Sequence, residues 1–344
     1  MEKMSQRSIY IDYIKALGLI LVILYHCQYV PFDSMFIHGI YAICVPLFFM
    51  VNGYLMLCKE RSIHALLKKN LKILIVMLFW ALVSTAVYMW TNGEWSANNL
   101  MGGGKSFILN SLLINKPYCN HLWFLKSIFI LNLFNPIIYS FIHRNDKRLK
   151  YLLLLLVLFT VRFIDIIVCR FSNPMLGWMT GFSVLYYVLG YALLDGHLAT
   201  NKIRTSWVVV LVIVAALLQW GYNWLFLSGP LCVLNAQKMW VNDIVWDGYN
   251  APFIVLLTAA ICLLFQRIPW KGCRWLLFVG ANSLAIYVMQ TPIQRIWQAV
   301  LPLNEWTAHY SICGAILPVF TLGTCMLITY GMLKNKYTKY FITI

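Results

Sequence analysis

Long runs of apolar residues, separated by short polar segments, dominate the chain. A transmembrane helix needs about 20 mostly apolar residues. Ten runs approach this length, and they cover residues 10–30, 39–57, 71–90, 121–142, 150–168, 178–194, 206–227, 250–266, 275–294 and 311–333. The pattern predicts an all-α, polytopic membrane protein with about ten transmembrane helices, which form a single transmembrane domain over residues 1–344.

The composition excludes the alternative of two soluble domains. Soluble domains are about 45–50% apolar and about 25% charged. This chain is 61% hydrophobic and only 11% charged, so it has too few polar residues to cover a surface that faces water. The composition therefore supports a chain whose solvent is the lipid bilayer.

The basic residues predict the orientation of the chain in the membrane. The formal net charge is +16, which in a soluble protein would suggest a nucleic-acid partner. Here 19 of the 27 Lys and Arg residues lie in the N-terminal segment, in the tail, and in the loops that follow the second, fourth, sixth and eighth predicted spans. The loops on the other side hold 5. Basic residues concentrate on the cytoplasmic side. Both termini are therefore predicted to be cytoplasmic, and nucleic-acid binding is excluded.

Two predicted outer loops are long, and the cysteines are scattered. The loops cover residues 91–120 and 228–249, and loops of this length are uncommon unless they are functional or disordered. The ten cysteines form no CxxC pair, so no metal site is predicted. Cys119, Cys169 and Cys232 lie in predicted outer loops, and their spacing leaves open whether any two form a disulfide.

The first apolar run carries two ionisable residues, Lys15 and His26, eleven positions apart. On a helix this spacing places both side chains on one face, about 16 Å apart along the axis. Charged groups within a span are costly and are functional candidates by default. The pair suits a long, thin donor that enters from the cytosol with its anionic end at Lys15. Its reactive end would then reach His26, and histidine is the usual general base for a hydroxyl proton.

A simpler interpretation of the same two residues is equally compatible with the spacing. Lys15 could extend to the inner interface and pair with Asp12, one helical turn away, while His26 anchors the outer interface. The spacing alone does not separate these alternatives.

Several motifs together resemble the acyltransferase-3 family of ten-helix membrane acyltransferases. The family signature is a basic residue, usually arginine, followed after ten residues by histidine, and Lys15 and His26 match it. The further matches, in the expected order, are VPLFFMVNGYLM at 45–56, HLWFL at 121–125 and SLAIYVMQTPI at 283–293. The segment YNAPFIVLL at 249–257 is also similar to the branch that acetylates surface polysaccharides.

The resemblance implies an acyl-CoA donor, usually acetyl-CoA, and a sugar hydroxyl as acceptor outside the cytoplasm. It implies that His26 is the catalytic residue and that Lys15 helps to hold the donor. A basic pair at the entry to the third span, commonly two arginines, matches Lys69 and Lys72. Lysine is a point charge without the planar fork of arginine, so phosphate binding should survive this change better than donor orientation.

The chain departs from the family pattern at two places. Many relatives carry histidine at the position of Gln290, and an amide cannot serve as acid or base. Many also have an acidic residue shortly after the tryptophan of the fourth span, whereas HLWFLKSIF has none.

Four further residues are candidates for substrate binding. Asn52 lies mid-span before a glycine, where helix packing is an equally good explanation. His121 and Trp123 lie at the outer mouth of the fourth span, where an ordinary interfacial aromatic belt is the alternative. Lys126 lies about one turn further along and could bind an anionic acceptor.

The sequence therefore favours an O-acyltransferase, in particular an O-acetyltransferase, of the bacterial plasma membrane. The expected partners are the lipid bilayer, acyl-CoA, and a glycan or lipid-linked sugar. The alternative is a transporter or flippase of a small molecule or glycolipid, which lacks support because no internal repeat is visible. A non-catalytic scaffold would leave Lys15 and His26 unexplained. The acceptor's identity, the acyl chain length, the oligomeric state, and the choice between direct transfer and a covalent intermediate stay open.

Overall fold

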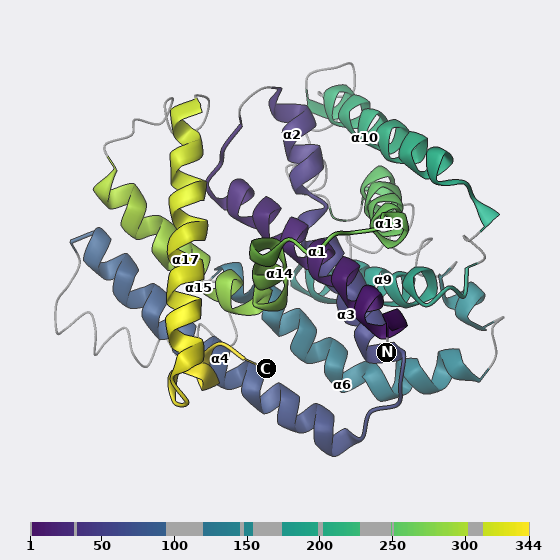
Figure 1. Ribbon diagram of the computed structural model, residues 1–344, viewed down its shortest axis with the longest axis horizontal. Coiled ribbons are helices and arrows are strands. Elements are labelled where there is room, and N and C mark those ends of the chain that lie inside the picture. Colours follow the sequence, from purple (N-terminus) through teal and green to yellow (C-terminus); the bar gives the residue numbers. More distant parts are fainter. Residues whose placement is uncertain are drawn as a thin grey trace. The chain divides into compact units, whose positions relative to one another are not determined.

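The computed structural model describes residues 2–30, 33–93, 120–144, 148–153, 174–198, 202–227, 249, 251–301 and 312–343 (Figure 1). Within these ranges every regular element is helical. The helices are α1 (Glu2–His26), α2 (Ser34–Tyr41), α3 (Cys44–Leu57), α4 (Ile63–Thr91), η1 (Asn120–Leu122), α6 (Trp123–His143), α9 (Pro174–Leu194), α10 (Thr205–Leu227), α13 (Pro252–Arg267), α14 (Arg274–Ala281), α15 (Ser283–Val300), η4 (Ile312–Ala315), α17 (Ile316–Lys334) and η5 (Thr338–Phe341).

The prediction of an all-α membrane protein is confirmed. Within the described ranges, six helical segments are long and apolar enough to cross a membrane, or up to seven if α14 and α15 form one span. Nine of the predicted spans coincide with helices. The total of ten spans and the cytoplasmic termini stay predictions. The fifth predicted span with Arg162, the two long outer loops and their cysteines lie largely or wholly outside the described residues.

The ninth predicted span, residues 275–294, is wrong in one respect. It is not one continuous helix, because the chain leaves helical geometry at Asn282, which has φ −108° and ψ 22°. Asparagine favours such breaks since its side chain competes for backbone hydrogen bonds. After the break, α15 continues to Val300, six residues beyond the predicted end. Periodicity alone could not show this interruption inside an apolar run.

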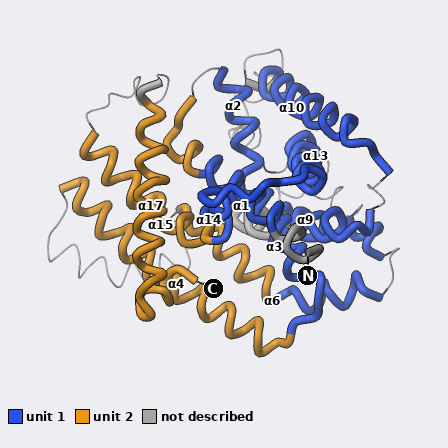
Figure 2. The backbone as a smooth tube through the Cα atoms, viewed as in Figure 1, with its two compact units in different colours: residues 1–22, 32–61, 133–281 blue, residues 23–31, 62–132, 282–344 orange. Residues whose placement is uncertain are grey.

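The chain divides into two compact units (Figure 2). Unit 1 comprises residues 1–22, 32–61 and 133–281, and unit 2 comprises residues 23–31, 62–132 and 282–344. Helix α1 contributes its longer N-terminal part to unit 1 and its C-terminal end to unit 2, and α6 is likewise shared.

In unit 1, α3 packs closely against α9 through two glycines. A Cβ atom on Gly53 would collide with the backbone carbonyl of Tyr187, and one on Gly190 would collide with that of Met50. Small residues permit such close approach of membrane helices. A hydrogen bond also joins α9 to α6 in this unit, because the Tyr187 hydroxyl donates to Asn135 Oδ1 at 2.6 Å.

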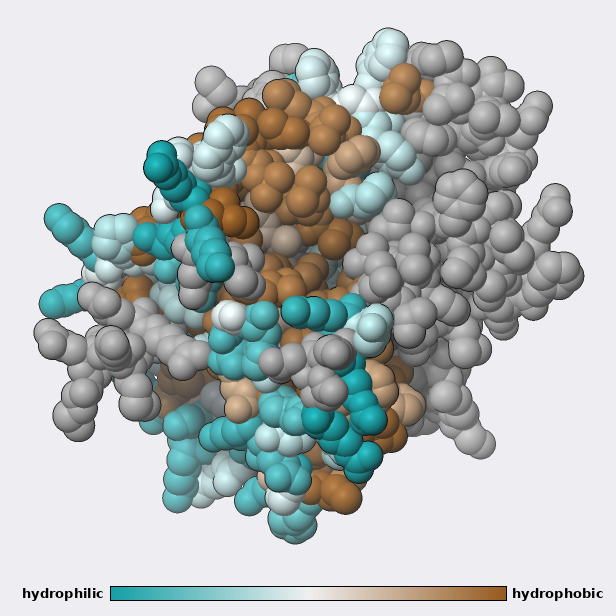
Figure 3. All heavy atoms as spheres, turned by 90° about the vertical axis from the view of Figure 1, so that its right-hand side faces the viewer, coloured by the Kyte–Doolittle hydropathy of each residue, from teal (hydrophilic) through white to brown (hydrophobic). Residues whose placement is uncertain are grey.

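Helix α10 of unit 1 exposes a long apolar surface. Figure 3 shows one face of the molecule, where hydrophobic side chains gather in a broad area and hydrophilic ones gather below it. The exposed large apolar residues of α10 are Trp207, Val209, Val210, Ile213, Val214, Leu217, Leu218, Trp220, Trp224 and Leu225. A soluble protein rarely exposes so much apolar surface in one place, so lipid is the expected solvent of this helix.

In unit 2, α15 packs against α4 and α17. The C-terminal turn η5 closes against α4, since the Trp80 indole donates to the Phe341 carbonyl at 2.8 Å and Phe79 stacks on the Phe341 ring. Helix α15, which lines the candidate site, is thus packed between α4 and α17.

Candidate active site

His26 is the last helical residue of α1. The helix ends in a Schellman motif, with the Gln28 amide donating to Tyr25 O at 2.9 Å and the Tyr29 amide donating to Leu24 O at 3.2 Å. Gln28 takes the left-handed position of this motif, with φ 52°, which usually belongs to glycine. This turn ends α1 directly after His26.

A side chain from α15 holds the backbone of His26. The Gln294 Nε2 donates to the His26 carbonyl at 2.6 Å, and Gln294 is buried. The terminal carbonyls of a helix have no partner inside it, so this bond satisfies a group that α1 cannot. The His26 ring is half-buried and meets Tyr25 edge to face at 5.5 Å between centroids. The backbone of His26 is therefore held by α15.

One face of α15 carries a polar stripe toward this site. Tyr287, Gln290 and Gln294 are three and four residues apart, a spacing that places them on one side of a helix, and all three are buried. The Tyr287 hydroxyl donates to the backbone carbonyl of His121. Gln290 Nε2 donates to Thr291 Oγ1 at 2.9 Å, whereas its Oε1 is buried without a partner. This stripe connects His26 and His121 to a single helix through their backbone carbonyls.

His121 is a buried histidine of unit 2. It lies on η1, just before the span that begins at Trp123, and only 3% of its surface is exposed. Neither ring nitrogen has a well-formed hydrogen bond. The pKa of His121 is lowered to about 3, chiefly by burial and to a smaller extent by His26 and Arg295, while the backbone of Val288 opposes the change. His121 is therefore a neutral imidazole at physiological pH.

Arg295 is a basic residue of α15 in unit 2. The Arg295 guanidinium lies 4.7 Å from the centroid of the Tyr88 ring. The described residues of unit 2 include no aspartate or glutamate, so no carboxylate among them neutralises this cation.

Lys15 makes the contact that the simpler interpretation expects. Its Nζ lies 2.5 Å from Asp12 Oδ1, one turn earlier on α1, and its side chain is 20% exposed. An anionic ligand at Lys15 would therefore compete with Asp12. Helix α1 is unbroken from Glu2 to His26. Lys15 and His26 therefore lie on one continuous helix, as their predicted shared face requires.

Lys69 and Lys72 lie near the start of α4 in unit 2, whereas Lys15 belongs to unit 1. The Ser62 side chain caps α4 by accepting from the Ala65 amide at 3.2 Å. The two lysines are half-buried and three residues apart, so they share a helix face. Together they present two ammonium groups on one side of α4.

The remaining substrate-binding candidates lie in different places. Asn52 is on α3 in unit 1, and its Nδ2 is buried without a hydrogen-bond partner. Trp123 and Lys126 are half-buried in the first turns of α6, in unit 2 with His121. The Trp123 ring meets Phe124 edge to face at 6.5 Å.

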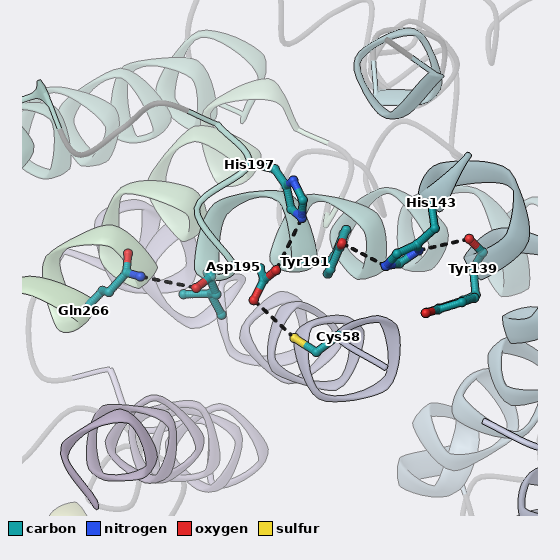
Figure 4. Close-up of polar contacts among 8 residues, drawn as sticks. Cys58, Tyr139, His143, Tyr191, Asp195, His197 and Gln266 are labelled. Atoms are coloured by element: carbon teal, nitrogen blue, oxygen red, sulfur yellow. Dashed lines mark hydrogen bonds and ion pairs between the residues drawn. The ribbon is translucent and has the colours of Figure 1, made fainter. Parts of the chain in front are cut away.

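A separate polar cluster joins the ends of α3, α6 and α9 in unit 1 (Figure 4). The Tyr191 hydroxyl lies 3.0 Å from His143 Nε2, Asp195 pairs with His197 at 3.3 Å, and Cys58 Sγ contacts Asp195 Oδ1 at 3.5 Å. Among the described residues, no group of three or more His, Cys, Asp or Glu side chains could hold a metal ion. This cluster ties three helix ends together.

Comparison with known proteins identifies the family. Residues 8–331, nearly the whole chain, match the acyltransferase-3 family, described as an acyltransferase domain. The chain belongs to this family. No curated protein and no solved structure matches it significantly. The protein is thus a membrane acyltransferase, and the resemblance seen in its motifs is confirmed at the level of the family.

The candidate site includes residues that the sequence analysis did not single out. Tyr287 and Gln294 hold the backbones of His121 and His26, and Arg295 supplies the nearby positive charge. The polar residues Tyr287, Gln290 and Gln294, which recur at helical spacing in an otherwise apolar run, were the sequence signal for this helix face. It was missed because SLAIYVMQTPI was considered as a motif rather than as a helix face.

Proposed function

We propose that this acyltransferase is an O-acyltransferase of the bacterial plasma membrane. It transfers an acyl group, in particular acetyl, from cytosolic acyl-CoA to a hydroxyl of a cell-surface or exported glycan. The observation that carries the proposal is the placement of His26. Its backbone is fixed by the end of α1 and by Gln294, and its half-buried ring belongs to a unit whose described residues include no carboxylate.

In the proposed reaction His26 acts as general base. It takes the proton of the acceptor hydroxyl while the oxygen forms a bond to the thioester carbon, and the carbon–sulfur bond breaks to release CoA. Positive charge develops on the imidazole at the C-terminal end of α1, where the helix dipole favours a cation. General base catalysis of this kind contributes about 10²–10⁴-fold to the rate.

We assign binding of the acyl-CoA donor to the basic residues that are predicted to lie toward the cytoplasmic side. Lys15, Lys69 and Lys72 would bind the phosphates of CoA, for which a point charge suffices. Asn52, Trp123 and Lys126 are proposed to contact the substrates. The buried and unpartnered Nδ2 of Asn52 supports such a role, because buried polar atoms are normally hydrogen-bonded.

The first test replaces His26. We expect His26→Ala to insert normally, to bind acetyl-CoA as the wild type does, and to lose acetyl transfer by at least about 100-fold. His64→Ala is the matched control, because His64 is an exposed histidine of the same unit. Full turnover by His26→Ala would contradict the mechanism. Failure of the wild type to bind acetyl-CoA would instead favour a transporter.

The second test identifies the acceptor class. Deletion of the gene should lower the mass of the surface polysaccharide by one acetyl unit per modified repeat. Re-expression of the wild type should restore the mass, and His26→Ala should not. An unchanged polysaccharide would contradict the glycan acceptor.

A further inference from the structure

The short loop between α13 and α14, residues 268–273, lies against α1 and is held there by Tyr13 (Figure 1). The Tyr13 hydroxyl donates to the Lys271 carbonyl at 2.7 Å and accepts from the Cys273 amide at 2.7 Å. Its ring also stacks on Trp270, with 4.5 Å between the ring centroids. One side chain of α1 therefore fixes the loop at three points, all within unit 1.

The helix that follows this loop also touches α1. A Cβ atom on Gly280 of α14 would collide with the backbone carbonyl of Asp12, so the two backbones meet directly. Small residues permit such close approach between membrane helices. The loop and α14 are thus both positioned by the segment of α1 that comes just before Lys15.

The end of the loop and the first turn of α14 present a basic and aromatic surface. Lys271, Arg274 and Trp275 are all exposed, and 49% of the Trp275 surface is accessible. Lysine and arginine bind phosphate oxygens, and arginine can do so with two parallel hydrogen bonds. An exposed indole offers a face on which a nucleobase can stack. Two cations beside an indole suit a nucleotide better than they suit a simple anion.

The place of this surface along α1 agrees with the geometry of the donor. In the proposed function the thioester of acyl-CoA lies at His26 and a phosphate lies near Lys15. The nucleotide is the end of CoA opposite the thioester, so it lies beyond Lys15 on the side away from His26. Tyr13 is on that side, about 20 Å from His26 along the helix axis. The loop that Tyr13 holds is therefore on the side where the nucleotide is needed.

We propose that Lys271, Arg274 and Trp275 bind the 3′-phosphoadenosine diphosphate end of acyl-CoA and that Tyr13 positions them. The inference rests on the proposed function and adds a nucleotide-binding surface to the donor site. The two cations bind phosphate oxygens, and the indole stacks on the adenine ring. Tyr13 does not touch the donor and acts only through the loop that it holds.

The test separates the nucleotide from the rest of the donor. Binding of radiolabelled acetyl-CoA is measured on purified protein in nanodiscs of phosphatidylethanolamine and phosphatidylglycerol. Two competitors are compared. Adenosine 3′,5′-bisphosphate carries the base and phosphates without the thioester, whereas S-acetylpantetheine carries the thioester without the nucleotide.

Lys271→Met, Arg274→Met and Trp275→Leu should each raise the Kd of acetyl-CoA by about three- to tenfold, because each removes one contact to the nucleotide. The inhibition constant of adenosine 3′,5′-bisphosphate should rise with it. That of S-acetylpantetheine should stay at the wild-type value.

Tyr13→Phe tests the positioning role, since it keeps the ring against Trp270 and removes only the hydroxyl. We expect it to raise the Kd of acetyl-CoA by about threefold and to leave S-acetylpantetheine unaffected, a selectivity that a general loss of folding would not produce. Lys202→Met and Arg204→Met are the matched controls, because both residues are exposed cations of another loop of unit 1. Both should bind all three ligands as the wild type does.

The outcomes distinguish this inference from the proposed function. An unchanged Kd of acetyl-CoA in the loop variants would overturn the nucleotide-binding surface and leave the acyltransferase function intact. Equal weakening of both competitors would also overturn it, since the loop would then serve folding or the membrane interface. A wild type that binds no acetyl-CoA would contradict the proposed donor and this inference with it. Weakening confined to the ligands that carry the nucleotide would support it.

Discussion

The Lys15 side chain is compatible with both interpretations of the first span, pairing with Asp12 and binding of the donor. It pairs with Asp12 at 2.5 Å, yet its side chain is 20% exposed and accessible to a ligand. A partly exposed ion pair of this kind is worth only about 0.2–1 kcal/mol. Asp12 therefore competes with a phosphate without blocking it.

The competition predicts the effect of removing Asp12. In Asp12→Asn we expect KM for acetyl-CoA to fall by roughly threefold, with kcat unchanged, because the Lys15 ammonium loses only a weak pair. Lys15→Met should raise the same KM. Steady-state kinetics on membranes would measure both. A raised KM in Asp12→Asn would mean that Asp12 orients Lys15 for the donor, contrary to this account.

His121 predicts a pH dependence of stability. Its folded pKa, about 3, is lower than the ordinary value of 6.5. Below pH 6.5 the unfolded chain takes up a proton that the folded chain excludes, so this residue lowers stability as the pH falls, by at most about 1.4 kcal/mol per pH unit. Between pH 7.5 and 5.5, Tm should fall more for the wild type than for His121→Phe. An identical fall would contradict the neutral assignment.

At the scale of elements, close helix contacts depend on glycine. The α3 and α9 backbones meet at Gly53 and Gly190, where a methyl group would strike a carbonyl of the other helix. Because backbone cannot move aside as a side chain can, the helices would have to separate.

Alanine at either of these glycines should therefore destabilise unit 1 strongly. We expect Gly53→Ala and Gly190→Ala each to lower Tm by several degrees and to reduce the yield of monodisperse protein in detergent. Gly221→Ala on α10 is the control, because its Cβ would meet open space. Unchanged melting of both variants would show that the helices do not approach so closely.

Helix α15 shows how an element can organise a site. Its polar stripe fixes His26 through Gln294 and His121 through Tyr287, while Pro292 leaves the Val288 carbonyl without its helical donor. The buried Gln290 lies in the middle of this stripe.

At the scale of the whole molecule, the orientation in the membrane is a prediction that can be tested through Cys58. This residue follows α3 in a loop predicted to be cytoplasmic, and its side chain is exposed. A membrane-impermeant maleimide should label it in inverted vesicles and not in intact cells. Cys58→Ser measures the background from the other cysteines. Labelling of Cys58 in intact cells would invert the predicted topology.

The sequence by itself determined the helical class, the membrane-spanning character, the family and the placement of Lys15 and His26 on one helix. These features depend on composition and on local spacing, which the chain carries along its length. The tertiary structure decided the break at Asn282, the bond from Gln294 to His26 and the burial of His121. Such contacts join residues far apart in sequence, 268 positions for Gln294 and His26. Periodicity cannot show them, because it records which face is apolar and not which helix meets it.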